Sequence, residues 1–207
     1  MKELIDKIEL LKNSEVSKTV NKRTEQFKNF DKQCNDELFK ELCFCILTAN
    51  FNAEKSIKIQ NEISGCFLKD SKDEISKKLK EYGHRFPNAR AEYIVDSLKC
   101  KDKLKEIVKF HDKKVIREWV VNNVKGLGYK EASHFLRNIG FDDYAIIDFH
   151  IVDVLVDHKL IERPKTITKK KYLEIEEILK RIAKETNLTL AELDLYLWYM
   201  ETGKVLK

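Results

Sequence analysis

The chain has 207 residues, which is enough to bury a core as one domain or as two small lobes. It holds six glycines and two prolines among many Lys, Glu, Leu and Ile residues, and this composition favours helix almost throughout. The net charge of +5 permits nucleic-acid binding without requiring it. We expect most of the charge, including the run Lys169-Lys170-Lys171, to form a solvated surface.

The sequence contains neither a membrane span nor a secretion signal. No apolar stretch is long enough to cross a bilayer, and Met1-Lys2-Glu3 leads straight into an amphipathic helix. We therefore expect a soluble, intracellular protein of the cytoplasm or nucleoid that does not associate with membranes. High charge with sparse Gly and Pro is also typical of a thermophilic source.

Hydrophobic periodicity and helix start signals predict helices along the whole chain. The segments Ser71-Lys72-Asp73-Glu74 and Thr189-Leu190-Ala191-Glu192 are capping boxes, and we expect Pro87 and Pro164 in connections. No repeat and no sustained strand-like alternation appears, so the predicted fold class is all-α. The expected helices span residues 2–12, 15–29, 36–49, 53–64, 73–83, 88–98, 101–110, 113–123, 129–139, 149–157, 169–186 and 190–202.

The cysteines are irregularly spaced and five in number, Cys34, Cys43, Cys45, Cys66 and Cys100. No Cys/His set has the spacing of zinc ligands. Two of the cysteines, Cys43 and Cys45, fall within an apolar helix, so we interpret them as small buried hydrophobic residues. The sequence therefore predicts no metal site.

The most informative segment covers residues 121–151. It predicts a helix, a four-residue hairpin over 125–128, a second helix opening on Tyr129, and an apolar run that ends in Asp148-Phe149-His150. Glycines at alternating positions of the hairpin let the backbone turn tightly with its amides outward. Amides at a helix start form a seat for a phosphate, and Lys130 lies just beyond that seat.

This segment resembles the helix-hairpin-helix DNA glycosylase superfamily. The run Gly126-Leu127-Gly128-Tyr129-Lys130 is similar to the form of the motif that carries a catalytic lysine, and Asp148 stands where that family has its aspartate. The segment Asp148-Phe149-His150 also resembles the Asp-x-His of 8-oxoguanine glycosylases. Two departures occur: Lys125 replaces the usual proline, and residues 145–147 lack the usual Gly-Pro or Pro-Val. Neither departure removes a chemical group.

The resemblance implies that Lys130 is the nucleophile. A lysine amine attacks the anomeric carbon of the sugar and forms a Schiff base, which acidifies the neighbouring proton and leads to β-elimination. Asp148 would stabilise the positive charge on the sugar or help to deprotonate the amine, or it caps the helix that begins at Phe149; both roles are compatible. His150 would donate to a DNA phosphate, with a structural or surface role as the alternative.

Base flipping needs residues that fill the gap left in the duplex. The resemblance implies that Asn50 reaches the orphaned partner base, although the neighbouring Asn52 suits an ordinary helix N-cap. Phe86 is our candidate wedge against the opposite strand, with a core residue that anchors the turn as the alternative. Arg85 or Arg90 would then meet the orphaned base or a phosphate.

For the base pocket, the resemblance implies three residues. His134 lies one helical turn after Lys130 and would form one wall, and Trp198 would stack on the other face unless it is a core residue. The short chain end resembles the compact archaeal and bacterial 8-oxoguanine DNA glycosylase/AP lyase family, in which the C-terminal lysine helps to recognise the lesion. Lys207 would do so here, with a frayed terminus as the alternative.

The same resemblance implies a two-lobed helix-hairpin-helix glycosylase fold with a DNA-binding cleft between the lobes. A central helical barrel would cover 50–141 and contain the hairpin motif over about 113–139, and residues 1–49 and 142–207 would form the second lobe. No cysteine follows Cys100, so we expect no iron-sulfur cluster. We expect no required cofactor, a monomer, and at most a structural monovalent cation held by the carbonyls of the hairpin.

The predicted function is a bifunctional repair enzyme that excises 8-oxoguanine from duplex DNA and nicks the abasic site by β-elimination. One alternative is an endonuclease-III-like glycosylase for oxidised pyrimidines, which the missing cluster cysteines and the Asp148-Phe149-His150 segment disfavour. A second alternative is a non-enzymatic helix-hairpin-helix module that grips DNA phosphates. That alternative explains the glycines but gives Lys130 and Asp148 no joint purpose.

Overall fold

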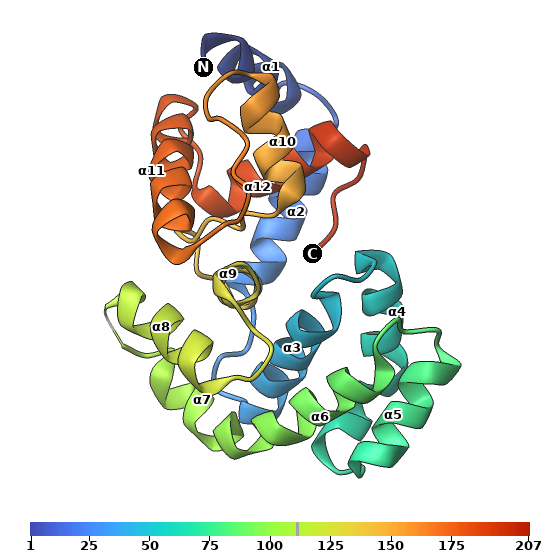
Figure 1. The fold of residues 1–207 in the computed structure, drawn as a ribbon. Helices are drawn as coiled ribbons and strands as arrows, with labels where there is room; N and C mark the ends of the chain where they lie inside the picture. The colour runs from blue at the N-terminus through green and yellow to red at the C-terminus, as the bar shows by residue number, and fades with distance from the viewer. Residues whose placement is uncertain (111) are drawn as a thin grey trace. The chain divides into compact units, whose positions relative to one another are not determined.

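A computed structural model describes residues 1–110 and 112–207, and the described residues form helices and no strands (Figure 1). The all-α prediction is therefore confirmed for this part of the chain. In chain order the elements are α1 (Lys2–Lys12), α2 (Val16–Lys28), α3 (Asn35–Thr48), α4 (Ala53–Ile63), the 3₁₀-helix η1 (Ser64–Leu68), α5 (Lys72–Glu81), α6 (Pro87–Ser97), the 3₁₀-helix η2 (Leu98–Cys100), α7 (Lys101–Ile107), α8 (Lys113–Asn123), α9 (Tyr129–Asn138), α10 (Phe149–Asp157), α11 (Lys169–Glu185) and α12 (Leu190–Thr202).

Most helix boundaries agree with the sequence predictions. Helices α1, α8, α10 and α12 match to the residue, and the largest difference is that α7 ends at Ile107 instead of 110. Pro87 was expected in a connection but is the first residue of α6, where its missing amide costs no hydrogen bond. The two 3₁₀-helices were not predicted, because such short segments have no periodicity of their own.

Local capping explains why several helices begin where they do. Ser71 and Thr189 each accept a hydrogen bond from the backbone amide three residues on, and the glutamate at that position bonds back, so both capping boxes are confirmed. Asn52 caps α4 through Lys55, and Asp148 caps α10 through Ile151. These four helix starts are set by side chains within the same turn.

The described chain divides into two compact units. Unit 1 comprises residues 1–30 and 136–207, and unit 2 comprises residues 31–135. The division expected from the sequence, 50–141 against the two chain ends, assigns residues 31–49 and 136–141 differently and remains a prediction for the family's lobes. The expected cleft between the lobes also remains a prediction.

Unit 2 is built around α3. Ten residues of this helix, among them Cys43 and Cys45, are buried, and α4, η1, α6 and α7 pack on it (Figure 1). Helix α5 packs in turn on α6. Burial raises the pKa of the Cys43 thiol well above its ordinary value, as expected for a cysteine that acts as a small hydrophobic residue.

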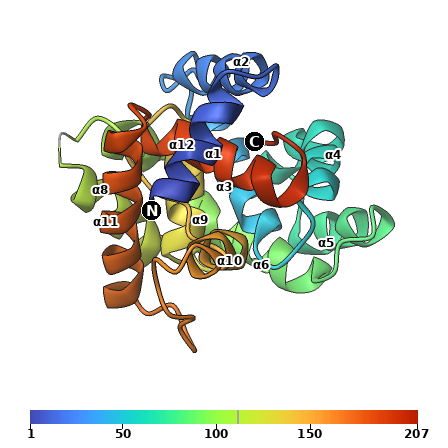
Figure 2. The same cartoon turned by 90° about the horizontal axis from the view of Figure 1, so that it is seen from above.

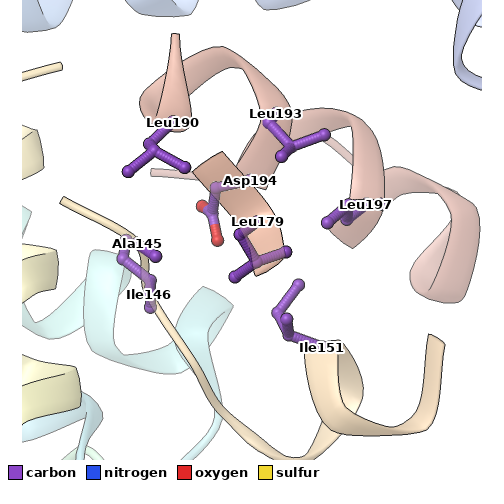
Figure 3. Close-up of a pocket in the computed structure, with 8 residues that line it drawn as sticks. All are labelled: Ala145, Ile146, Ile151, Leu179, Leu190, Leu193, Asp194 and Leu197. Carbon is purple, nitrogen blue, oxygen red and sulfur yellow. The ribbon is translucent and has the colours of Figure 1, made fainter. Parts of the chain in front are cut away.

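Unit 1 is built around α12, which contacts α1, α2, α10 and α11 (Figure 2). Its buried Leu195 and Tyr196 join Val20 and Phe27 of α2 in one apolar cluster. A small cavity, lined by apolar side chains and Asp194, lies among α10, α11, α12 and the segment that precedes α10 (Figure 3). No helix in the described part of the chain is long and apolar enough to cross a membrane.

Candidate active site and nucleic-acid interface

The turn between α8 and α9 requires a glycine at position 126. Gly126 has φ +86°, and a Cβ atom there would lie 2.3 Å from Cδ2 of Tyr93. Leu127, the next residue, is buried, and its amide donates to the carbonyl of Val124 at 3.3 Å. The predicted helix-hairpin-helix is therefore present, and its tight backbone is seated on the ring of Tyr93.

Lys125 explains how the turn does without the usual proline. Its Nζ lies 2.5 Å from Oε1 of Glu92 and 3.5 Å from Oδ2 of Asp96, and 5.4 Å from the ring centroid of Tyr93. The hydrogen bond with Glu92 raises the pKa of Lys125. Helix α6 thus holds the turn through charge where a proline would restrict the backbone.

The backbone amide that was predicted to bind a phosphate is hydrogen-bonded to a carboxylate in the first turn of α9. The amide of Gly128 donates to Oε2 of Glu131 at 3.3 Å. The other oxygen of Glu131 lies 3.9 Å from Nζ of Lys130. A DNA phosphate that binds this amide must therefore displace Glu131, and the displacement would also change the charge beside the Lys130 amine.

Lys130 and His134 lie one helical turn apart on α9. The Lys130 side chain is about one-quarter exposed, at 25%, so it is neither sealed in the core nor fully solvated. His134 is buried and meets Phe44 of α3 edge to face, with ring centroids 5.6 Å apart. The structure thus gives His134 a fixed ring beside the candidate nucleophile.

Two further segments of unit 2 carry the residues predicted to meet the opposite strand. Asn50 is exposed just after α3 in a left-handed conformation with φ 57°, a backbone that asparagine tolerates better than most residues. Phe86 is 37% exposed, and the guanidinium of exposed Arg85 lies 4.9 Å from its ring centroid. Both Asn50 and Phe86 are therefore accessible to a ligand.

Arg90 is buried, whereas a contact with DNA would require an exposed side chain. Its side chain is buried, and Nη2 donates to the carbonyl of Ala49 at 2.5 Å. Its guanidinium also lies over the rings of Phe86 and Tyr93, at 5.5 and 5.6 Å. Burial lowers the pKa of Arg90. Between the two arginines, exposed Arg85 is the one that suits contact with DNA.

The remaining predicted residues lie in unit 1. Asp148 accepts from the amide of Ile151 at 3.1 Å, which is the capping role offered as its alternative. The exposed His150 meets Trp198 edge to face at 4.9 Å, so the structure brings these two predicted site residues together. The buried Nε1 of Trp198 has no hydrogen-bond partner among the described residues.

Some residues around the site had no signal in the sequence. Tyr93 and Glu131 contact the hairpin, His84 contacts the segments that carry Asn50 and Phe86, and Phe149 is 67% exposed between Asp148 and His150.

Lys207, which was predicted to recognise the lesion, is partly buried at the chain end. Within the described residues, no group of three or more His, Cys, Asp and Glu side chains could hold a metal ion.

The glycine turn, the lysine just inside α9 and the aspartate at the start of α10 define a class of protein, the helix-hairpin-helix DNA glycosylases. A sequence model of the family described as "8-oxoguanine DNA glycosylase" matches residues 20–188. The chain belongs to this family.

Individual relatives agree along nearly the whole chain. The 8-oxoguanine DNA glycosylase/AP lyase of Methanocaldococcus jannaschii is 57% identical over 99% of both chains, and that of Thermotoga maritima is 45% identical over 99% of both. A crystal structure of the M. jannaschii 8-oxoguanine glycosylase/lyase in complex with 15mer DNA containing 8-oxoguanine has a TM-score of 0.96 at 55% identity, covering 99% of this chain and 100% of that one. The T. maritima crystal structure has a TM-score of 0.94 at 45% identity, covering 100% and 99%.

Proposed function

We propose that this protein removes 8-oxoguanine from duplex DNA and then cuts the strand at the resulting abasic site. The observation that carries the proposal is the position of Lys130, at the second residue of α9 directly after the glycine turn. The M. jannaschii and T. maritima relatives are named 8-oxoguanine DNA glycosylase/AP lyase, which supports both activities.

Lys130 performs the covalent step. Its neutral amine bonds to C1′ of the sugar while the bond from C1′ to the base breaks, and the base leaves. The C1′–O4′ bond then breaks, a proton passes from the amine to O4′, and the opened sugar is joined to Lys130 as a Schiff base. The Schiff base acidifies a proton on C2′, and loss of that proton expels the 3′ phosphate by β-elimination. Asp148 offers a carboxylate oxygen beyond the one that caps α10, and this second oxygen stabilises the positive charge that develops on the sugar.

Glu131 lies where a DNA phosphate would bind beside the Lys130 amine. One carboxylate oxygen accepts from the Gly128 amide at 3.3 Å, and the other lies 3.9 Å from Nζ of Lys130. A DNA phosphate that binds the Gly128 amide would displace this carboxylate and take its place beside Lys130.

The lesion is recognised through the two groups that it adds to guanine. 8-Oxoguanine carries an N–H donor and a carbonyl acceptor on its five-membered ring, and guanine has neither. Lys207 helps to recognise this N–H, while His134 and Trp198 supply the walls of the pocket. Discrimination of this kind is strong, because guanine would leave the acceptor in the pocket without its donor.

The DNA backbone and the opposite strand are held by separate residues. The amides of Gly126 and Gly128 and the His150 ring bind phosphates. Asn50, Phe86 and Arg85 meet the strand opposite the lesion. The protein acts as a monomer inside a prokaryotic cell, without an organic cofactor, and the hairpin carbonyls offer a seat for a monovalent cation.

Borohydride trapping tests the nucleophile directly. The protein is incubated with duplex DNA containing 8-oxoguanine, with and without borohydride, which reduces a Schiff base to a stable covalent adduct. We expect an adduct with the native chain and none with Lys130→Gln. Lys114→Gln is the matched control, because Lys114 is an exposed lysine on the other helix of the hairpin motif.

Other outcomes would redirect the proposal. Trapping that persists in Lys130→Gln would place the nucleophile elsewhere. An adduct with DNA containing thymine glycol, but none with 8-oxoguanine, would favour an enzyme for oxidised pyrimidines. Binding to DNA without base release or trapping would leave only the role of a binding module.

A further inference from the structure

Two short segments of unit 2 meet around one buried histidine. The segment 47–52, here called the Asn50 loop, comprises the last two residues of α3 and the four that follow, and the segment 85–87, here called the Phe86 turn, leads into α6. Each carries one residue that the proposed function assigns to the strand opposite the lesion. The residue between them is His84, which is 4% exposed.

Both ring nitrogens of His84 are bonded, one to each segment. Nε2 lies 3.0 Å from the carbonyl oxygen of Leu47, and Nδ1 accepts from the amide of Phe86 at 3.0 Å. A carbonyl can only accept and an amide N–H can only donate, so Nε2 carries the proton and Nδ1 the lone pair. The neutral ring in this one tautomer satisfies both bonds, and a protonated ring would lose the bond to Phe86.

The ring face of His84 makes a third contact. It packs on Phe51 of the Asn50 loop, with centroids 4.1 Å apart and planes tilted by 35°. Desolvation in this site lowers the pKa of His84, and the nearby positive charge of Arg90 acts in the same direction. Burial and charge therefore favour the neutral ring that the two hydrogen bonds require.

Arg90 ties the same two segments a second time. Its Nη2 donates to the carbonyl of Ala49, at the base of the Asn50 loop, and its guanidinium lies 5.5 Å from the ring centroid of Phe86. The left-handed backbone of Asn50 immediately follows Ala49. The spacing between the Asn50 loop and the Phe86 turn is thus set by two buried side chains and not by the exposed residues themselves.

We infer that His84 is a positioning residue, which holds the Asn50 loop and the Phe86 turn in one register so that Asn50 and Phe86 engage the opposite strand together. His84 itself touches no DNA. The inference rests on the proposed function, because it assumes that Asn50 and Phe86 meet that strand. It predicts that loss of His84 impairs the response of the enzyme to the base opposite the lesion, and not the chemistry at Lys130.

Three variants separate the contacts. His84→Phe keeps an aromatic ring against Phe51 but removes both hydrogen bonds. His84→Asn retains an acceptor near Nδ1 for the Phe86 amide, and His84→Gln retains a donor near Nε2 for the Leu47 carbonyl. His158→Gln is the matched control, since His158 at the C-cap of α10 is also a bonded imidazole, with Nδ1 2.8 Å from the carbonyl of Val154.

Each variant is measured on three substrates under single turnover. These are 8-oxoguanine opposite cytosine, 8-oxoguanine opposite a tetrahydrofuran site that has no base, and single-stranded DNA with a natural abasic site. We expect His84→Phe to excise opposite cytosine about tenfold more slowly, as the loss of two buried hydrogen bonds suggests. The ratio of rates opposite cytosine and opposite tetrahydrofuran should fall, and strand cleavage of the single-stranded substrate should stay within about twofold.

Equal losses on all three substrates would overturn the inference, because they would indicate a general structural role. An unchanged rate opposite cytosine would overturn it as well. If His84→Phe does not fold, the Asn and Gln variants decide: each should lower the cytosine-to-tetrahydrofuran ratio, and an unchanged ratio in both would refute the positioning role. Failure of the proposed function would appear separately, as a native chain that forms no borohydride adduct.

Discussion

At the residue scale, Asp148 combines a structural contact with a proposed catalytic one. Its Oδ1 caps α10, which is the start signal that any aspartate at this position would supply. The cap alone therefore explains why the residue is an acid or amide, and the proposed charge stabilisation requires that it be an acid. A substitution that preserves only the cap can separate the two roles.

Asp148→Asn is the substitution that does so. Asparagine caps helices about as well as aspartate, so we expect the free energy of unfolding to stay within about 0.5 kcal/mol of the native value. Excision of 8-oxoguanine should fall by at least about 100-fold, because the charge opposite the developing cation is lost. Denaturant unfolding and single-turnover excision measure the two effects.

Asp148→Ala is the control, and it should cost about 1 kcal/mol of stability through loss of the cap. Full activity in Asp148→Asn would reduce this residue to a helix cap.

Gly126 provides a second prediction at the residue scale. Gly126→Ala places a methyl group in a left-handed backbone and 2.3 Å from the Tyr93 ring. We expect a loss of at least about 2 kcal/mol in the free energy of unfolding, from backbone strain together with the clash. Urea denaturation measures it.

Gly128→Ala is the matched control two residues away. Gly128 does not have a positive φ, and a Cβ atom there would meet only Oε2 of Glu131, at 3.5 Å. Equal losses in the two variants would show that the Tyr93 contact does not define the turn.

At the element scale, a largely buried ion pair within unit 1 ties the last turn of α9 to α12. Nη1 of Arg137, near the end of α9, donates to Oδ2 of Asp194 on α12 at 3.0 Å, and the Arg137 guanidinium lies 4.6 Å from the ring centroid of Phe27. The two side chains are 3% and 12% exposed.

We expect Asp194→Ala to lower the free energy of unfolding by about 3 kcal/mol. The reason is that removing one partner leaves a buried guanidinium without the carboxylate that compensates its charge. Thermal or denaturant unfolding measures the loss. Glu15→Ala is the control, because Glu15 pairs with Lys18 on the surface, where both side chains are mostly exposed, and it should change stability little. A similarly small effect of Asp194→Ala would contradict a structural role for the pair.

At the scale of the whole molecule, affinity for DNA depends on a few placed cations more than on net charge. The chain has 40 basic and 35 acidic residues, and the net charge of +5 is small for its length. Attraction to DNA must therefore come from cations that reach phosphates. Exposed Arg85, which precedes α6, and buried Arg90, within α6, offer a direct comparison of two arginines five positions apart.

We expect Arg85→Gln to weaken binding to duplex DNA and to reduce the slope of log K against log salt by about one, the value for one phosphate contact. Arg90→Gln should leave that slope unchanged and instead lower stability, since Arg90 holds the carbonyl of Ala49 inside the protein. Titrations at several salt concentrations test both. A reduced slope in Arg90→Gln, with none in Arg85→Gln, would reverse the assignment of the two residues.

The sequence by itself determined the helices and the hairpin motif. Helix starts depend on side chains within one turn, as with Ser71 and Thr189, and these signals are readable without knowing the fold. The turn around Gly126 is equally local, and so is the position of Lys130 just after it. The family resemblance supplied roles for these residues, and the family itself is confirmed by the relatives.

Only the tertiary structure decided which residues support the site. His84 meets Leu47 from 37 positions away, Lys125 meets Glu92 from 33, and Arg90 meets Ala49 from 41. No local pattern marks such pairs, because contacts between distant segments depend on how the helices pack. The same packing placed Arg90 in the interior and left Arg85 exposed, a distinction that burial makes and composition cannot.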